Sequence, residues 1–193
     1  MLAAYLIDTQ RLLQNPTPTT GLYSTELLTA CINKARRHLA IKGECIRRIG
    51  TLNTSNGTRV YGFDTVDLGV SADTGIGGLL NARRINYVVG DGEQRLEFLA
   101  WEWFDIYHLN NATPLGNQND PGSRFPRYWT QYGQGGSAAA NLSDTSGSIY
   151  IDPLPDDVYN LRLDCQCYPI PLVTDDTNEA LPITFTDVVP FLA

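Results

Sequence analysis

The segment GSIYIDPLPDDVYNLRLDCQCYPIPL, residues 147–172, carries the clearest structural pattern in this sequence. Two apolar-rich stretches, residues 148–152 and 158–168, flank the residues PLPDD at positions 153–157. Proline fixes its own φ and lacks an N–H, and aspartate tolerates turn geometry, so these residues predict a turn. The whole segment is therefore predicted to form a β-hairpin.

The second arm of this predicted hairpin alternates strictly. Its apolar residues are Tyr159, Leu161, Leu163, Cys165 and Cys167, and the polar residues between them are Asn160, Arg162, Asp164 and Gln166. A period of two places the apolar set on one face of a strand, against a core. Cys165 and Cys167 share that face, which is poor placement for a mutual disulfide, so both are predicted to be buried, reduced thiols.

Two helices are predicted at the N-terminal end. Apolar residues recur at helical spacing over residues 2–14, and the sequence NPTP at 15–18 stops this helix. The second helix has a capping residue in Ser24, an apolar stripe that includes Leu28 and Ile32, and Gly43 as its expected C′ residue. Another helix is expected to start within residues 183–187.

The residues between these helices have sequence patterns typical of strands. Hairpins are predicted from residues 46–52 with 58–63 and from 84–89 with 94–99, because Asn-Gly and Gly-Asp-Gly sequences separate the arms. A further strand is predicted at residues 127–132 and a short, mostly buried helix at 101–109. Loops are predicted at residues 64–82, 110–126 and 133–147.

These elements predict an α+β architecture, in which terminal helices form a small bundle beside a central antiparallel β-sandwich-like or barrel-like domain. Residues 1–44 are the helical part and are expected to pack with residues 179–193. Residues 45–172 are the β-rich domain, and residues 173–193 are an acidic linker followed by the start of the C-terminal helix.

Charge is distributed unevenly over the 193 residues, whose net charge is −7. Residues 1–50 carry seven basic and three acidic residues, a net charge of +4, and the remainder carries −11. Most of the surface would repel phosphates, so the chain is predicted to be a poor general nucleic-acid binder. It has no apolar stretch long enough to span a bilayer and is predicted to be soluble and cytosolic, without a membrane partner.

Four basic residues gather on the second helix: Lys34, Arg36, Arg37 and Lys42. One interpretation is a solvated face near the C-terminal end of the helix, where the helix dipole favours cations. The other interpretation is a partner-binding face that docks onto an acidic surface of another protein or of a neighbouring subunit.

No catalytic, cofactor-binding or metal-binding residue is predicted. Asp152, Asp156 and Asp157 cluster at the predicted turn, and Glu102 and Asp105 lie in an aromatic segment. Turn capping and ordinary polar-face placement account for these carboxylates. His38 and His108 are the only histidines, and nucleophile-elbow, HExxH and kinase-type sequences are absent.

Several of these features together resemble the head-to-tail adaptor (connector) proteins of short-tailed bacteriophages. They are the turn DPLPDDVY at 152–159, the sequence YPIPL at 168–172, the acidic pair at 175–176 and Leu181-Pro182. The resemblance implies a structural virion protein without a cofactor that forms a ring, dodecameric in that family, under the portal protein. The ring would join the portal to a tail nozzle or tube protein and continue the channel through which genomic DNA passes without specific binding.

By the same resemblance the protein is located in the virion, at the capsid–tail junction, after synthesis in the host bacterial cytoplasm. Two alternatives stay open from the residues themselves. One is a virion-associated peptidoglycan hydrolase that uses a pair of the carboxylates above. The other is a different tail-completion or baseplate module.

Overall fold

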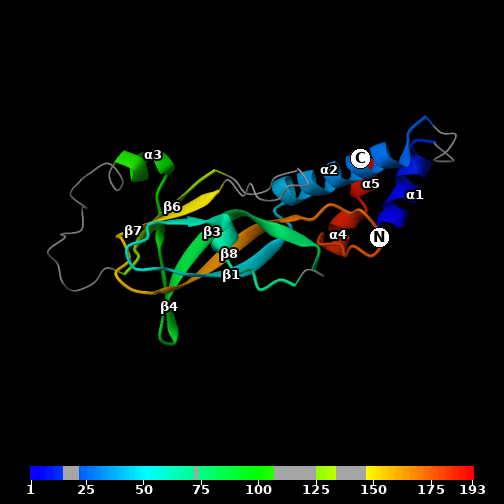
Figure 1. Ribbon diagram of the computed structural model, residues 1–193. Coiled ribbons are helices and arrows are strands. Elements are labelled where there is room, and N and C mark those ends of the chain that lie inside the picture. Colours follow the sequence, from blue (N-terminus) through cyan, green and yellow to red (C-terminus); the bar gives the residue numbers. More distant parts are fainter. Residues whose placement is uncertain (15–21, 72–73, 107–124, 134–146) are drawn as a thin grey trace. The chain divides into compact units, whose positions relative to one another are not determined.

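A computed structural model describes residues 1–14, 22–71, 74–106, 125–133 and 147–193 (Figure 1). Its helices are α1 (Leu2–Leu12), α2 (Thr25–Gly43), α3 (Trp101–Phe104), α4 (Ile183–Thr186) and α5 (Val189–Leu192), and a 3-10 turn lies at Phe63–Thr65. Its strands are β1 (Arg47–Asn53), β2 (Val60–Gly62), β3 (Ile76–Val89), β4 (Gly92–Arg95), β5 (Glu97–Phe98), β6 (Tyr128–Tyr132), β7 (Ser148–Asp152) and β8 (Asn160–Pro169). Helices at both ends with strands between them confirm the predicted α+β class.

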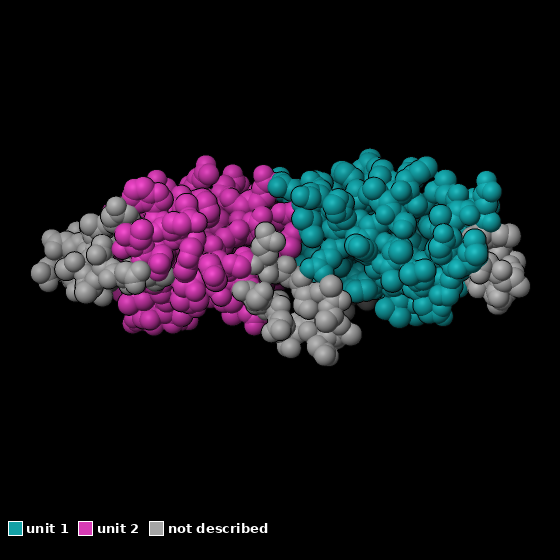
Figure 2. Space-filling view, turned by 90° about the horizontal axis from the view of Figure 1, so that it is seen from above, with its two compact units in different colours: residues 1–47, 70–77, 167–193 teal, residues 48–69, 78–166 magenta. Residues whose placement is uncertain are grey.

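The chain forms two compact units, shown in teal and magenta in Figure 2. The first, here called the helical unit, comprises residues 1–47, 70–77 and 167–193. The second, here called the β unit, comprises residues 48–69 and 78–166. Among the helices of the described chain, none is long and apolar enough to cross a membrane.

Helices α1, α2 and α5 contact one another within the helical unit. The two N-terminal helices form where the periodicity predicts them, and the Ser24 hydroxyl accepts a hydrogen bond from the Leu27 N–H at 3.3 Å, as expected of a cap. The C-terminal end of α2 differs from the prediction. Gly43 is still helical, and the left-handed position is taken by Glu44 at φ 46°. Near the C-terminus the expected helix is two short helices, α4 and α5.

The strands form two four-stranded sheets, with the orders β1-β8-β3-β4 and β2-β7-β6-β5. The predicted hairpin of residues 147–172 is therefore wrong, because its two arms, β7 and β8, lie in different sheets. The predicted hairpin of residues 46–63 is wrong for the same reason, since β1 pairs in the first sheet and β2 in the second. Both turn segments connect one sheet to the other.

These two connections hydrogen-bond to each other. The Thr54 N–H donates to the Tyr159 carbonyl at 2.9 Å, and the Tyr159 N–H donates to the Thr54 hydroxyl at 2.7 Å. The Gly57 N–H donates to the Pro155 carbonyl at 2.8 Å. Gly57 adopts φ 73°, which glycine reaches without a steric penalty. The predicted turn residues thus do reverse the chain. These hydrogen bonds, however, join each turn to the other and do not lie within one hairpin.

The hairpin of β3 and β4 is confirmed, with Val89 opposite Gly92 across the turn. Its first arm is longer than predicted, because residues 76–82, expected to be loop, belong to β3. Its second arm is shorter, because residues 97–98 form β5, which pairs in parallel with β6 in the other sheet.

Three other predictions have mixed outcomes. Helix α3 forms, but Trp103 is 61% exposed while Phe104 is fully buried, so this helix is only partly buried. Strand β6 forms as predicted. Most of each loop predicted at 110–126 and 133–147 lies outside the described residues, as do residues 107–109, which include His108.

The alternation in β8 is confirmed. Leu161, Leu163, Cys165 and Cys167 are fully buried, whereas Asn160 and Arg162 are exposed. Gln166 is the exception among the polar residues, because it is only 3% exposed. Its side-chain oxygen accepts a hydrogen bond from Asn81, which in turn accepts one from Gln131 in the other sheet, each at 3.1 Å. A buried glutamine is tolerated because its polar atoms are paired.

The buried thiols lead to the first prediction. Cys165 and Cys167 are free and fully buried, so a thiol reagent should label neither in the folded protein and both after denaturation. The measurement is reagent titration followed by mass spectrometry of the labelled peptides. Cys31 and Cys45, which are partly exposed, serve as the internal comparison. Fast labelling of Cys165 in native protein would contradict the prediction.

Candidate docking surface of the helical unit

Arg36 lies in the interior of the helical unit, not on its surface. It is fully buried on α2 beside the apolar residues Leu28, Ile32, Ala35 and Ala40. Arg36 is therefore not part of the exposed surface on which the partner-binding face was predicted. Arg36 follows Ile32 by four positions, so helical spacing places it on the same face as the apolar stripe.

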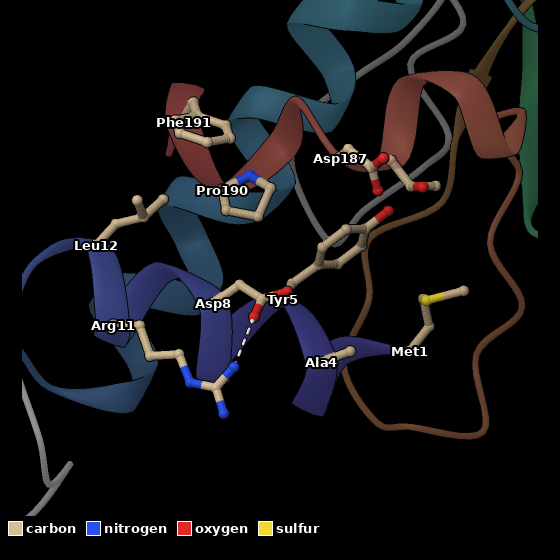
Figure 3. Close-up of a pocket in the computed structure, with 10 residues that line it drawn as sticks. Met1, Ala4, Tyr5, Asp8, Arg11, Leu12, Asp187, Pro190 and Phe191 are labelled. Atoms are coloured by element: carbon tan, nitrogen blue, oxygen red, sulfur yellow. Dashed lines mark ion pairs between the residues drawn. The ribbon is translucent and has the colours of Figure 1, made fainter.

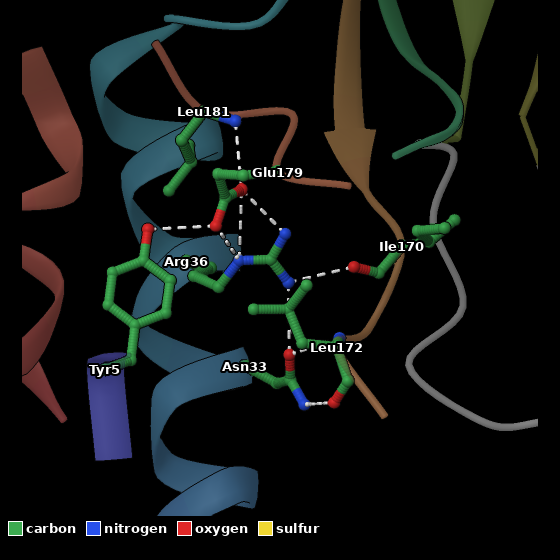
Figure 4. Close-up of polar contacts among 7 residues, drawn as sticks. All are labelled: Tyr5, Asn33, Arg36, Ile170, Leu172, Glu179 and Leu181. Atoms are coloured by element: carbon green, nitrogen blue, oxygen red, sulfur yellow. Dashed lines mark hydrogen bonds and ion pairs between the residues drawn. The ribbon is translucent and has the colours of Figure 1, made fainter. Parts of the chain in front are cut away.

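The Arg36 guanidinium is paired with Glu179, as Figure 4 shows. Its Nη2 donates to Glu179 Oε1 at 2.7 Å and its Nε to Oε2 at 2.9 Å, which is a two-pronged contact. The side chains of Arg36 and Glu179 are 1% and 5% exposed, respectively. A charge pair this deeply buried is tolerated only when the remaining donors and acceptors are also satisfied.

The remaining groups are satisfied by other residues of the helical unit. Arg36 Nη1 donates to the Ile170 carbonyl at 2.9 Å and to the Asn33 side chain at 3.1 Å. Asn33 also bonds both backbone groups of Leu172, accepting from its N–H at 2.8 Å and donating to its carbonyl at 3.0 Å. On the other side, Glu179 accepts from the Tyr5 hydroxyl at 2.9 Å and from the Leu181 N–H at 3.0 Å.

The acid–base properties of two groups follow from this arrangement. Burial alone would raise the pKa of Glu179, but hydrogen bonds from Arg36 and from the Leu181 N–H, with the charge of Arg36, hold it below its usual value. Burial, then the charge of Glu179 and the hydrogen bond to it, raises the pKa of the Tyr5 hydroxyl. Both groups therefore keep their neutral-pH forms, a phenol and a carboxylate.

Tyr5 connects this interior pair to a surface groove, which Figure 3 shows. The groove has a volume of about 460 Å³ and lies along α1, α4 and α5. Its lining is Met1, Ala4, Tyr5, Asp8, Arg11, Leu12, Thr186, Asp187, Pro190 and Phe191. Phe191 is 74% exposed and Leu12 is 49% exposed, so apolar side chains remain open to solvent here. Exposed apolar surface rimmed by polar residues is typical of interaction sites.

The groove carries two carboxylates, Asp8 and Asp187, and one guanidinium, Arg11. Asp8 pairs with Arg11 at 3.6 Å, and Asp187 is exposed, with no ion pair among the residues that the structure describes. At the N-terminal end of α1, Asp175 accepts a hydrogen bond from the Ala3 N–H at 2.7 Å and pairs with the terminal amine of Met1 at 3.0 Å. A carboxylate is favoured at the first turn of a helix, where backbone N–H groups are unpaired.

The other predicted partner-binding residues lie on the outward side of α2. Lys34 and Lys42 are exposed, and Arg37 is partly exposed. The outward side of α2 also carries apolar residues, since Leu27 is 49% exposed and Ile41 is 36% exposed. Neither Glu179 nor Asn33 is predicted from the sequence, although a basic residue within an apolar stripe signals that a buried acidic partner exists somewhere in the chain.

The carboxylates considered for catalysis have structural partners. Asp152 is 7% exposed and pairs with Arg59 at 3.2 Å. Asp156 accepts a hydrogen bond from the Tyr159 hydroxyl, and this bond raises the pKa of Tyr159 to about 12. Asp157 accepts from the Val158 N–H at 2.7 Å, and Glu102 is exposed. Within the described ranges, no group of three or more His, Cys, Asp or Glu residues is arranged to hold a metal ion.

The described residues form a helical unit with an exposed groove and a β unit that also carries the short helix α3. A family model, that of the SU10 adaptor protein, matches residues 2–192. This match covers nearly the whole chain, so the protein belongs to the SU10 adaptor family, and the predicted resemblance to phage adaptors is confirmed. Family membership supports a role as a structural phage adaptor in general. No curated protein sequence matches the chain at a significant level.

The buried pair leads to the second prediction. Arg36→Met removes the cation and leaves the Glu179 carboxylate buried without its main partner, which should lower the free energy of unfolding by about 3–5 kcal/mol at pH 7. Lys34→Met is the matched control, since Lys34 is exposed on the same helix and its change should stay within about 0.5 kcal/mol. The measurement is urea unfolding monitored by circular dichroism.

The pH dependence provides a second readout for the same variant. A carboxyl whose folded pKa is depressed contributes stability above its unfolded pKa and loses it as pH falls through the folded value. Glu179 in the wild type should therefore contribute above about pH 4.5 and lose that contribution at lower pH. In Arg36→Met the pKa of Glu179 should rise, so the deficit should shrink on acidification. A constant deficit from pH 7 to pH 4 would contradict this account.

Proposed function

We propose that this protein is a head-to-tail adaptor that docks under the portal protein of a phage capsid and links it to the tail. Copies of the chain form a ring, dodecameric as in the adaptors it resembles, that meets a tail nozzle or tube protein. The ring continues the channel through which genomic DNA leaves without being bound specifically. The observation that carries this proposal is the family match over residues 2–192.

In this proposal the helical part and the β-rich part of the chain contact different partners. The helical part, residues 1–44 with 179–193, meets the portal, and the β-rich part, residues 45–172, meets neighbouring copies and the tail. Support for the first assignment is the exposed apolar and charged surface of the helical unit, including Phe191 and Lys34. The chain's net charge of −7 suits a channel wall that does not retain DNA. The finished protein resides at the capsid–tail junction after synthesis in the host cytoplasm.

The basic residues that remain exposed on α2 are assigned a role in docking. Lys34, Arg37 and Lys42 contact an acidic surface of the portal or of a neighbouring copy. Charges at the rim of an interface mainly speed association and make it sensitive to salt.

The third prediction tests this role. Lys34→Glu with Lys42→Glu should slow assembly on the cognate portal about tenfold or more at low salt, because attraction becomes repulsion. Added salt should reduce the difference in assembly rate between the variant and the wild type. The measurement is sedimentation of portal mixed with each protein at low and high ionic strength, with negative-stain images to identify rings.

Arg84→Glu with Arg95→Glu is the matched control, because it makes the same change in net charge at exposed positions of the β unit. Circular dichroism confirms that each variant is folded. Equal assembly of the α2 variant and the wild type at every salt concentration would show that these lysines form a solvated face and do not take part in docking. Failure of the wild type to sediment with the portal would contradict the adaptor proposal itself.

The fourth prediction concerns the hydrolase alternative. Asp156→Asn with Asp157→Asn should change only stability or assembly, because both carboxylates serve the turn. Neither the wild type nor this variant should hydrolyse peptidoglycan. The measurement is lysis of purified peptidoglycan by wild type and variant. A cleared zone with the wild type that disappears in the double variant would establish the hydrolase instead.

A further inference from the structure

The groove along α1 and the outward side of α2 carry matching patterns. Along α1 the groove runs from Met1 and Ala4, through Asp8 and Arg11, to Leu12. Apolar side chains thus lie at its ends, and the ion pair of Asp8 with Arg11 lies between them. Asp187 adds a second carboxylate from the opposite wall, and Phe191 adds an apolar ring, as Figure 3 shows.

The outward stripe of α2 has the complementary order. Leu27, Lys34 and Ile41 are seven residues apart, which places them on one side of the helix. Leu27 and Ile41 are 49% and 36% exposed, and Lys34 between them is exposed. The stripe is therefore apolar at both ends and cationic in the middle.

The two surfaces also agree in length. At a rise of about 1.5 Å per residue, the α1 side of the groove extends about 17 Å from Met1 to Leu12, and the stripe extends about 21 Å from Leu27 to Ile41. A helix laid along the groove would bring Lys34 to the two carboxylates while its apolar ends cover Leu12 and Phe191 at one end and Met1 and Ala4 at the other.

The chain's own α2 is unable to fill this groove. Its inward side, with Leu28, Ile32, Arg36 and Ala40, already packs inside the helical unit, and α2 contacts α1 and α5 through that side. The outward stripe points the other way on the same helix. An α2 helix that enters the groove must therefore come from another molecule.

We infer that the groove formed by α1, α4 and α5 binds the outward stripe of α2 from a second copy of this chain. Asp187 of one copy, the groove carboxylate that has no ion pair among the described residues, faces Lys34 of the next copy, with Asp8 beside it. The groove and the stripe are different surfaces, so each copy offers one of each. Such a contact repeats from copy to copy and closes into a ring when the rotation between copies allows it. The inference rests on the proposed adaptor ring and assigns the acidic surface that Lys34 meets to the neighbouring copy.

A charge-exchange experiment tests this contact. The groove variant carries Asp8→Lys with Asp187→Lys, and the stripe variant carries Lys34→Glu with Lys42→Glu. Each variant alone should assemble at least tenfold less than wild type, because groove and stripe then have charges of the same sign. A one-to-one mixture should recover to within about threefold of wild type, because each groove then meets a stripe of opposite charge.

The readout is the amount of ring measured by sedimentation, with the cognate portal and with concentrated protein alone. A mixture of the stripe variant with the Arg84→Glu, Arg95→Glu protein is the control: only the latter should assemble, and mass spectrometry of the rings should find the stripe variant excluded. A folded mixture that fails to recover, or a groove variant that assembles like wild type, would overturn the inference. If the stripe variant fails on the portal and mixing does not help, Lys34 meets the portal instead.

Cross-linking of the wild type gives a test that needs no variant. A carbodiimide joins an amine to a carboxylate directly, so Lys34 should become linked to Asp187 or Asp8. Mixing ¹⁴N- and ¹⁵N-labelled protein identifies links between copies by mass. Links from Lys34 only to portal carboxylates, or only within one copy, would contradict the contact. Loss of portal binding by the wild type would remove the adaptor role, whereas inter-copy links would still report on this contact.

Discussion

The buried pair of Arg36 and Glu179 is the interaction on which the helical unit depends. Two charges are almost completely removed from water, and this loss of hydration is offset only because nearly every polar atom of the pair has a partner. The partners come from α1, α2, the segment that follows β8 and the segment that precedes α4. No single segment can satisfy the pair, so all four must be in place together, which favours one arrangement over looser alternatives.

The same pair also holds one side chain of the groove. Tyr5 donates its hydroxyl hydrogen to Glu179 inside the unit, while its ring lines the groove outside. Asp175 holds the first turn of α1 through the Ala3 N–H. Surface side chains held by satisfied interior groups lose little entropy when a partner binds, which would favour the docking proposed for this surface. The structural role expected of an SU10 adaptor is thus supported by how the unit is built.

The β unit shows a different kind of constraint. Its two sheets are joined by connections that the local sequence presents as hairpin turns, and those connections satisfy each other through Thr54, Tyr159, Gly57 and Pro155. Each turn alone would leave backbone groups without hydrogen-bond partners. Together, each turn supplies partners for the backbone groups of the other. This arrangement also gives a structural role to the aspartates that gather there: Asp156 and Asp157 serve the turn, and Asp152 pairs with Arg59.

Elements with local signals could be predicted from the sequence. Periodicity and capping placed α1 and α2, alternation placed β8 and its buried thiols, and the turn residues predicted the family. Which strands pair and which charges are buried became apparent only in the folded chain. Strand partners depend on contacts between distant residues, so a turn signal shows that the chain reverses without showing which sheet receives the next strand. Arg36 looked like a surface cation for the same reason, since the carboxylate that holds it inside is Glu179, 143 positions further along the chain.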